Sequence, residues 1–163
     1  MHQHDEILNE WLYRIGRSHL AHNLAAAKYE PLNRRFGATA AVLSAVVGTA
    51  VFATLEASPS SYLKIFTGLI SIAAAVLASL HTYLGYSDLA GRHKIAAARF
   101  GELRTQLEQI KAFPPASDEM AQRIALFCSD WDTKSKESPI ISPKIFEDAD
   151  RKTKRGAGHL TRK

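Results

Sequence analysis

Two long runs without a charged side chain constrain this sequence more than any other feature. They cover Phe36–Leu55 and Ile65–Tyr86, and neither contains Asp, Glu, Lys or Arg. At about 1.5 Å of rise per helical residue, a run of roughly 20 residues crosses a hydrocarbon core of about 30 Å. A segment in lipid must be helical because lipid offers no partners to backbone N–H and C=O groups. The sequence therefore predicts a transmembrane helical hairpin whose link contains Ser58 and Pro59.

The composition of the two runs leaves an alternative open, which is a pair of buried core helices in a soluble bundle. We favour spans, because two such runs of nearly equal length stand close together. Both runs are rich in Ala, Gly, Ser and Thr, where a single-pass anchor would carry Leu and Ile. Such weakly apolar helices suit packing against other helices or contact with water.

Small residues recur along one face of each expected span. The candidates for lining a pore or for packing between helices are Gly37, Ala41, Ser44 and Gly48 in the first span and Ser71, Ala75, Ser79 and Thr82 in the second. This spacing lets another helix approach closely, and the polar members suit a water-filled path in an oligomer. Tight packing without a pore fits the same residues equally well. His81 is a titratable side chain near the end of the second span and is the candidate for a gate.

Heptad-like patterns flank both expected spans. They predict helices over residues 5–30 and 87–112, with a break or kink at Pro31. Because a hairpin sends one helix up and the other down, we expect these two to run antiparallel and to form a cytoplasmic stalk. The residues of the stalk seam are Leu12, Ile15, His19, His22, Tyr29, His93, Phe100, Leu103 and Leu107. The seam histidines suit either a pH sensor or a hydrogen-bonded structural role, and we favour the second.

The rest of the chain changes in composition twice. Met120, Ile124, Phe127 and Trp131 form the apolar face of a short helix that we expect over residues 118–132. Residues 133–163 are rich in Lys, Ser, Pro and Gly, and they predict a flexible basic tail. The expected architecture is therefore all-α, with a two-transmembrane helical domain over residues 1–132 and a tail over residues 133–163.

Basic residues near the span ends predict the orientation. They are Lys28, Arg34 and Arg35 before the first span and Arg92, Lys94 and Arg99 after the second, whereas the link offers Lys64 alone. By the positive-inside rule both termini face the cytoplasm. We expect the basic C-terminus to be solvated, and a nucleic-acid partner is the less favoured interpretation.

No constellation of residues supports catalysis. The sequence has no Gly-rich phosphate loop, no zincin motif and no Cys-x-x-Cys. Its single cysteine, Cys128, excludes an intrachain disulfide and a cysteine-based metal cluster. We therefore expect no enzyme activity, no metal and no cofactor, and the expected partners are the lipid bilayer and further copies of the chain.

Residues from Trp11 to Ile110 resemble the SLATT family of two-transmembrane effectors. The likeness is carried by Ala27-Lys28-Tyr29-Glu30-Pro31-Leu32, by the Ala/Ser/Gly-rich paired spans, and by the segment YSDLAGRHKIAAARF at 86–100. The resemblance implies an effector of a bacterial antiphage or conflict system that oligomerises and permeabilises the inner membrane. It further implies a trigger, either a nucleotide second messenger or a neighbouring nucleotidyltransferase-type signalling enzyme. The alternative function is a non-conducting membrane scaffold that anchors a cytosolic partner through its stalk and basic tail.

Overall fold

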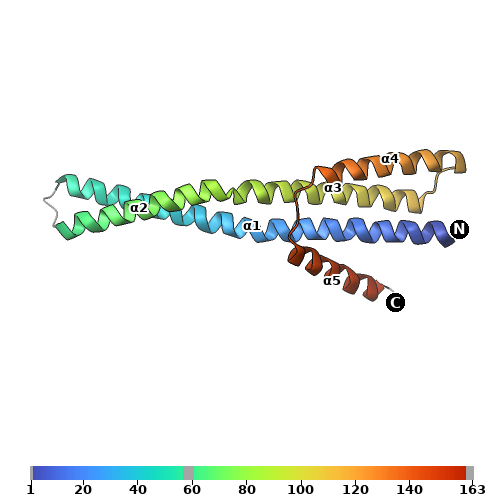
Figure 1. Cartoon of the computed structure of the whole chain (residues 1–163), viewed down its shortest axis with the longest axis horizontal. Coiled ribbons are helices and arrows are strands. Elements are labelled where there is room, and N and C mark those ends of the chain that lie inside the picture. The colour runs from blue at the N-terminus through green and yellow to red at the C-terminus, as the bar shows by residue number, and fades with distance from the viewer. Residues whose placement is uncertain (1, 57–60, 161–163) are drawn as a thin grey trace. The chain divides into compact units, whose positions relative to one another are not determined.

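The computed structural model describes residues 2–56 and 61–160, and in these ranges every regular element is an α-helix. The helices are α1 (His2–Glu56), α2 (Ser61–Leu84), α3 (Tyr86–Ala112), α4 (Ser117–Lys136) and α5 (Pro143–Leu160). The all-α prediction is thus confirmed (Figure 1). The link with Ser58 and Pro59 lies outside the described residues.

The chain changes direction at a glycine, not at the proline that the sequence suggested. The break expected at Pro31 is wrong, because α1 continues through this residue. Proline removes one backbone hydrogen bond at a cost of about 3 kcal/mol or more, which packing on both sides of the site must offset. Ala26 before it and Ala40 after it are both buried. Between α2 and α3, Gly85 has φ of 54°, a left-handed conformation that suits glycine and ends the helix.

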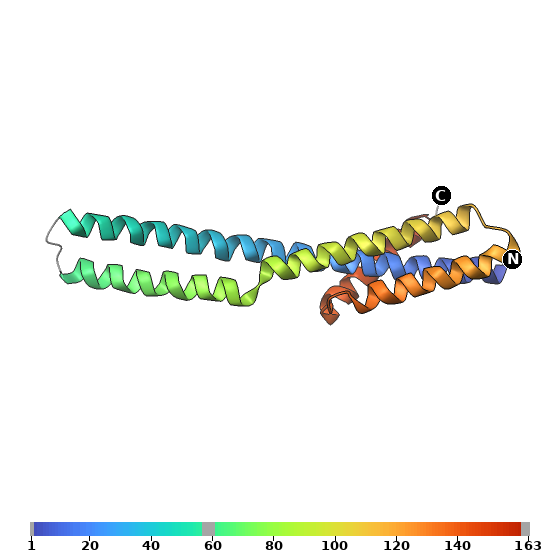
Figure 2. The same cartoon turned by 90° about the horizontal axis from the view of Figure 1, so that it is seen from above.

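The helices form two compact units, which we describe separately. One unit, the helix pair, comprises Tyr29–Asp88 and contains the second half of α1 together with α2. The two helices run antiparallel, as the contacts of Gly37 with His81 and of Phe36 with Tyr86 require (Figure 2). The other unit, the bundle, comprises residues 1–28 and 89–163, of which the structure describes 2–28 and 89–160.

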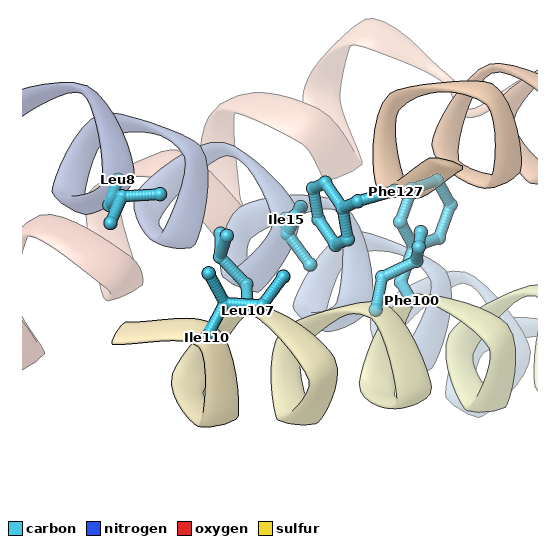
Figure 3. Packing of buried hydrophobic residues seen from close by; sticks show 7 residues of the cluster. Leu8, Ile15, Phe100, Leu107, Ile110 and Phe127 are labelled. Carbon is cyan, nitrogen blue, oxygen red and sulfur yellow. The ribbon is translucent and has the colours of Figure 1, made fainter. Parts of the chain in front are cut away.

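Three helices of the bundle enclose one hydrophobic core. Figure 3 shows side chains from α1, α3 and α4 pointing toward one another. The fully or almost fully buried members are Leu8, Ile15, Phe100, Leu103, Leu107, Ile110 and Phe127. Trp11 extends this core, since its ring stacks on that of Phe127 with 6.0 Å between the centroids. Apolar burial at heptad spacing therefore holds the first half of α1 against α3 and α4.

Most of the seam residues proposed from the sequence lie where α1 meets α3. Ile15, His22, His93, Phe100, Leu103 and Leu107 are buried there, and Leu12 packs beside the core. His19 is half-buried, with its Nε2 close to Gly101. Tyr29 belongs to the helix pair, where its ring stacks on that of Tyr86 at 6.0 Å.

The expected flexible tail is the clearest error of the sequence analysis. Helix α4 continues to Lys136, and residues 143–160 form α5, which contacts α1 (Figure 1). Ile145 and Ala149, one helical turn apart, are buried and supply the apolar face that the composition concealed. Asp150 then binds two side chains of α1, Tyr13 and Arg17. The predicted boundary at residue 132, between a helical domain and a flexible tail, is therefore wrong.

A matched pair of leucines tests this account of the core. Leu103 is 0% exposed and Leu126 is 65% exposed, so we expect Leu103→Ala to lower the free energy of unfolding by about 2–5 kcal/mol and Leu126→Ala by roughly 0.5 kcal/mol or less. The measurement is denaturant unfolding of the purified full chain, followed by circular dichroism. Equal losses from the two variants would contradict the assigned core.

Candidate functional site

The helix pair exposes large apolar side chains, whereas two alanines at the contact between its helices are buried. Phe66, Leu69 and Ile72 are each more than 60% exposed, whereas Ala40 and Ala74 at the contact between the helices are 8% and 7% exposed. Within the described residues, one helical stretch is long and apolar enough to cross a membrane. It is Ser61–Ala112, which includes α2. This arrangement is the reverse of a water-soluble fold, where the large apolar side chains are the ones removed from water.

The small and polar residues of the two helices occupy one side of the pair. Each residue advances about 100° around a helix axis, so Ala41 of α1 lies roughly a quarter turn, and Ser44 about 40° in the same sense, from the face that carries Ala40. Ala75 and Thr82 of α2 lie a quarter turn, in the same sense, from the face that carries Ala74. In antiparallel helices equal rotations lead to the same side of the pair, and all four of these residues are exposed. Ser79 is exposed next to them, while Gly37, Gly48 and Ser71 are half-buried.

The hydroxyl groups of this region are satisfied within their own helix. Ser71, Ser79 and Thr82 donate to the carbonyl oxygens of Thr67, Ala75 and Ala78 at 2.8, 2.9 and 3.1 Å. A hydroxyl that bonds the carbonyl one turn back needs no partner from its surroundings, and its oxygen can still accept a hydrogen bond from water. These side chains are therefore compatible with lipid and with a wet surface alike.

His81 fills the space opposite a glycine. A Cβ atom at Gly37 would lie 3.3 Å from Cε1 of His81, so a larger residue at this position of α1 would force the imidazole to move by a few tenths of an ångström. The Nδ1 atom of His81 is buried and has no hydrogen-bond partner among the residues that the structure describes. This nitrogen of His81, which the sequence suggested as a gate, is thus left without the partner that a buried polar atom usually has.

In the bundle, two seam histidines meet across the contact between α1 and α3. Nδ1 of His22 lies 2.9 Å from Nδ1 of His93, and both residues are buried. The ring of His22 also stacks on Phe100, with 5.4 Å between the centroids. This hydrogen bond requires one Nδ1 with a proton and one without, so a second proton would place two donors face to face. Burial, with the charge of His93 as a smaller cause, lowers the pKa of His22 to about 4.

Other titratable groups lie near this pair. Burial lowers the pKa of His93 as well. Burial and, secondarily, the charge of Arg104 lower the pKa of His19, one turn from His22. At neutral pH the histidines of the seam are therefore uncharged packing groups.

A second polar cluster, which the sequence analysis missed, fixes α5 on α1. The carboxylate of Asp150 accepts hydrogen bonds from the Tyr13 hydroxyl at 2.6 Å and from Arg17 at 2.9 Å, and Lys154 lies 2.7 Å away. The Arg17 guanidinium also lies over the ring of Phe146, 4.5 Å from its centroid. Bonds from Lys154, Tyr13 and Arg17 hold the pKa of Asp150 well below its usual range. The spacing of Ile145 and Ala149 was the only signal in the sequence.

The residues that the structure describes contain no cluster of three or more His, Cys, Asp or Glu that could hold a metal ion. Cys128 is half-buried beside the hydrophobic core.

The buried histidine pair predicts a pH dependence of stability. Between pH 6.5, the ordinary pKa of histidine, and the lowered value near 4, the unfolded chain binds more protons than the folded one. The stability that the neutral pair contributes is thus complete above about pH 6.5 and is lost as the pH falls toward 4. Denaturant unfolding at a series of pH values measures the slope, at most about 1.4 kcal/mol per pH unit for each histidine.

The variant H22Q/H93Q should make this slope shallower, because it removes two of the three seam histidines that gain protons on unfolding and leaves His19. His4→Gln, at an exposed position near the N-terminus, is the control and should leave the slope as it is. An unchanged slope in the double variant would show that other groups carry the acid sensitivity.

The Asp150 cluster predicts that one carboxylate decides whether α5 stays docked. Asp150→Asn weakens charge-assisted bonds to α1, so the α5 amides should exchange hydrogen faster while those of α3 keep their rates. Asp148→Asn is the matched control, because Asp148 pairs with Arg151 inside α5. Hydrogen exchange read by mass spectrometry distinguishes the two, and faster exchange in both variants would contradict the assignment.

No family model matches the chain, and comparisons with curated proteins and with solved structures also found no match.

Proposed function

We propose that the protein is a membrane effector that oligomerises and permeabilises the bacterial inner membrane, as the resemblance to the SLATT family implies. The observation that carries the proposal is the reversed polarity of the helix pair, with large apolar side chains outside and Ala40 and Ala74 buried at the contact between the helices. Lipid removes those side chains from water, at a gain of roughly 25 cal/mol for each Å² that is buried. Both termini lie in the cytoplasm in this proposal.

The small, polar side of the helix pair supports the pore rather than a simple anchor. Ala41 and Ser44 of α1 and Ala75, Ser79 and Thr82 of α2 carry no bulk that would keep a neighbouring copy away. When several copies place this side toward a common axis, hydroxyl oxygens line the centre and the larger side chains face lipid. The bundle contributes no catalytic group in this proposal, and it supplies the part of the chain that receives a signal.

A non-conducting scaffold is the second candidate, and one observation favours it. In the bundle, Phe113 and Leu126 are 79% and 65% exposed beside a hollow of about 650 Å³ between α3 and α4. Exposed apolar groups around a concave surface are typical of a protein-binding site. In this alternative the helix pair only holds the bundle at the membrane.

The pore proposal predicts that bulk on the small side blocks leakage. Ser79→Leu places an apolar group where water would pass, so leakage of an encapsulated dye from liposomes with the reconstituted full chain should fall by about an order of magnitude. Ala73→Leu adds a leucine on the opposite, exposed side of α2 and is the matched control. It should leak as the unmodified chain does.

Sedimentation with the liposomes verifies that both variants insert. If both leak equally, the assigned pore side is wrong. A third result would be that liposomes with the inserted, unmodified chain never leak and that the chain never lowers the membrane potential of expressing cells. That result would reject the pore proposal in favour of the scaffold.

A further inference from the structure

The docking of α5 gathers positive charge from two distant parts of the sequence. A hollow of about 560 Å³ at the contact of α1 with α5 is lined by Arg17, Phe146, Glu147, Asp150, Arg151, Lys154 and Arg155. Four of these side chains are cationic and two are acidic, which leaves a surplus of two positive charges. Arg17 reaches the hollow only because α5 folds back on α1.

The centre of this hollow already has the chemistry of an anion site. One carboxylate, that of Asp150, receives a hydroxyl bond from Tyr13 and charged bonds from Arg17 and Lys154. Three donors that converge on a single anionic group form a preorganised cradle. Because Arg17 is held flat over Phe146, its guanidinium stays in place without further ordering.

Two further arginines beside the cradle, Arg151 and Arg155, are able to bind an anion. Arg155 forms no ion pair with any residue that the structure describes, and it is exposed. Arg151 pairs with Asp148 of its own helix, and both side chains are more than half exposed, so this pair is weak. A ligand with more negative charge than a carboxylate therefore finds additional partners at the rim.

We propose that this hollow binds the phosphate group of an anionic ligand, which takes the place of the Asp150 carboxylate between Arg17 of α1 and Lys154 of α5. A phosphate carries between about −1.5 and −2 charges at neutral pH and offers three acceptor oxygens, whereas a carboxylate offers two oxygens and one charge. Its charge matches the surplus of the lining, and arginine forks bind phosphate with two parallel bonds. The site is independent of whether the helix pair conducts.

The test uses the purified full chain in phosphatidylcholine nanodiscs. Inorganic pyrophosphate is titrated by calorimetry, with potassium chloride at the same ionic strength as the control for screening. Hydrogen exchange of α5 is followed in both salts. We expect saturable binding of pyrophosphate and slower exchange in α5, because the ligand binds the docked form, and chloride should produce neither.

Matched variants locate the site. Arg155→Gln and Arg17→Gln should each weaken pyrophosphate binding by about tenfold, because each removes one charged hydrogen-bond donor. Lys144→Gln removes the same charge from α5 outside the hollow and should bind as the unmodified chain does. Since Arg155 is not bonded to α1, its substitution leaves the docking intact and remains informative if Arg17→Gln undocks α5.

Asp150→Asn separates competition from a merely structural contact. This variant should bind pyrophosphate more tightly than the unmodified chain, because the resident carboxylate no longer occupies the cradle. Its α5 should exchange faster than that of the unmodified chain without ligand, and pyrophosphate should slow this exchange, because the phosphate joins Arg17 of α1 to the cations of α5. Weaker binding by Asp150→Asn, or equal losses from Arg155→Gln and Lys144→Gln, would overturn the proposal.

A second arm identifies the source of the phosphate. Phosphatidylcholine vesicles with or without phosphatidic acid are added to the same nanodiscs, and α5 exchange is measured again. A response to phosphatidic acid alone assigns the site to a lipid headgroup, and a response to pyrophosphate alone assigns it to a soluble ligand. No response to either would overturn the proposal.

Discussion

The structure depends on α1, whose first half packs in the bundle and whose second half packs in the helix pair. Over residues 2–28, α1 packs Leu8, Ile15 and neighbouring side chains into a protein core. Beyond Tyr29 the same helix contributes alanine and glycine to the contact with α2 and turns Val42 and Val46 outward. The two halves therefore pack different side chains, and α1 stays helical through Pro31, where one backbone hydrogen bond is missing, because both halves are packed.

Much of the fold follows from local patterns. Heptad spacing identified Ile15, Leu103 and Leu107 as core residues of an antiparallel contact, because burial of a helix stripe leaves a periodic signal in the sequence. The uncharged runs likewise indicated where apolar side chains stay exposed. The sidedness of the helix pair needed the structure, since the rotation of each helix about its axis is set by which small residues meet, here Ala40 and Ala74.

The errors share a physical cause, which is long-range contact. Asp150 meets Tyr13 across 137 positions of the sequence, and no local pattern reports such a bond. The average composition of the segment that forms α5 is charged and typical of a linker. Two buried residues one turn apart, Ile145 and Ala149, and the carboxylate of Asp150 nevertheless order it as a helix. The paired histidines were visible as seam residues, but only the structure shows that their Nδ1 atoms face each other.

The two polar clusters of the bundle, the histidine pair and the Asp150 cluster, differ in whether a ligand can reach them. Both histidines of the pair are buried, at 3% and 2% exposed, so an outside ligand does not reach them, and their protonation weakens the contact between α1 and α3. The Asp150 cluster lies at the surface beside a hollow whose lining has four cationic and two acidic side chains. Because its carboxylate is one of several anions that the same donors would accept, the docking of α5 is the contact of the bundle that a ligand can exchange. A change of that kind has a defined readout, since it alters one helix while the apolar core of α1, α3 and α4 remains closed.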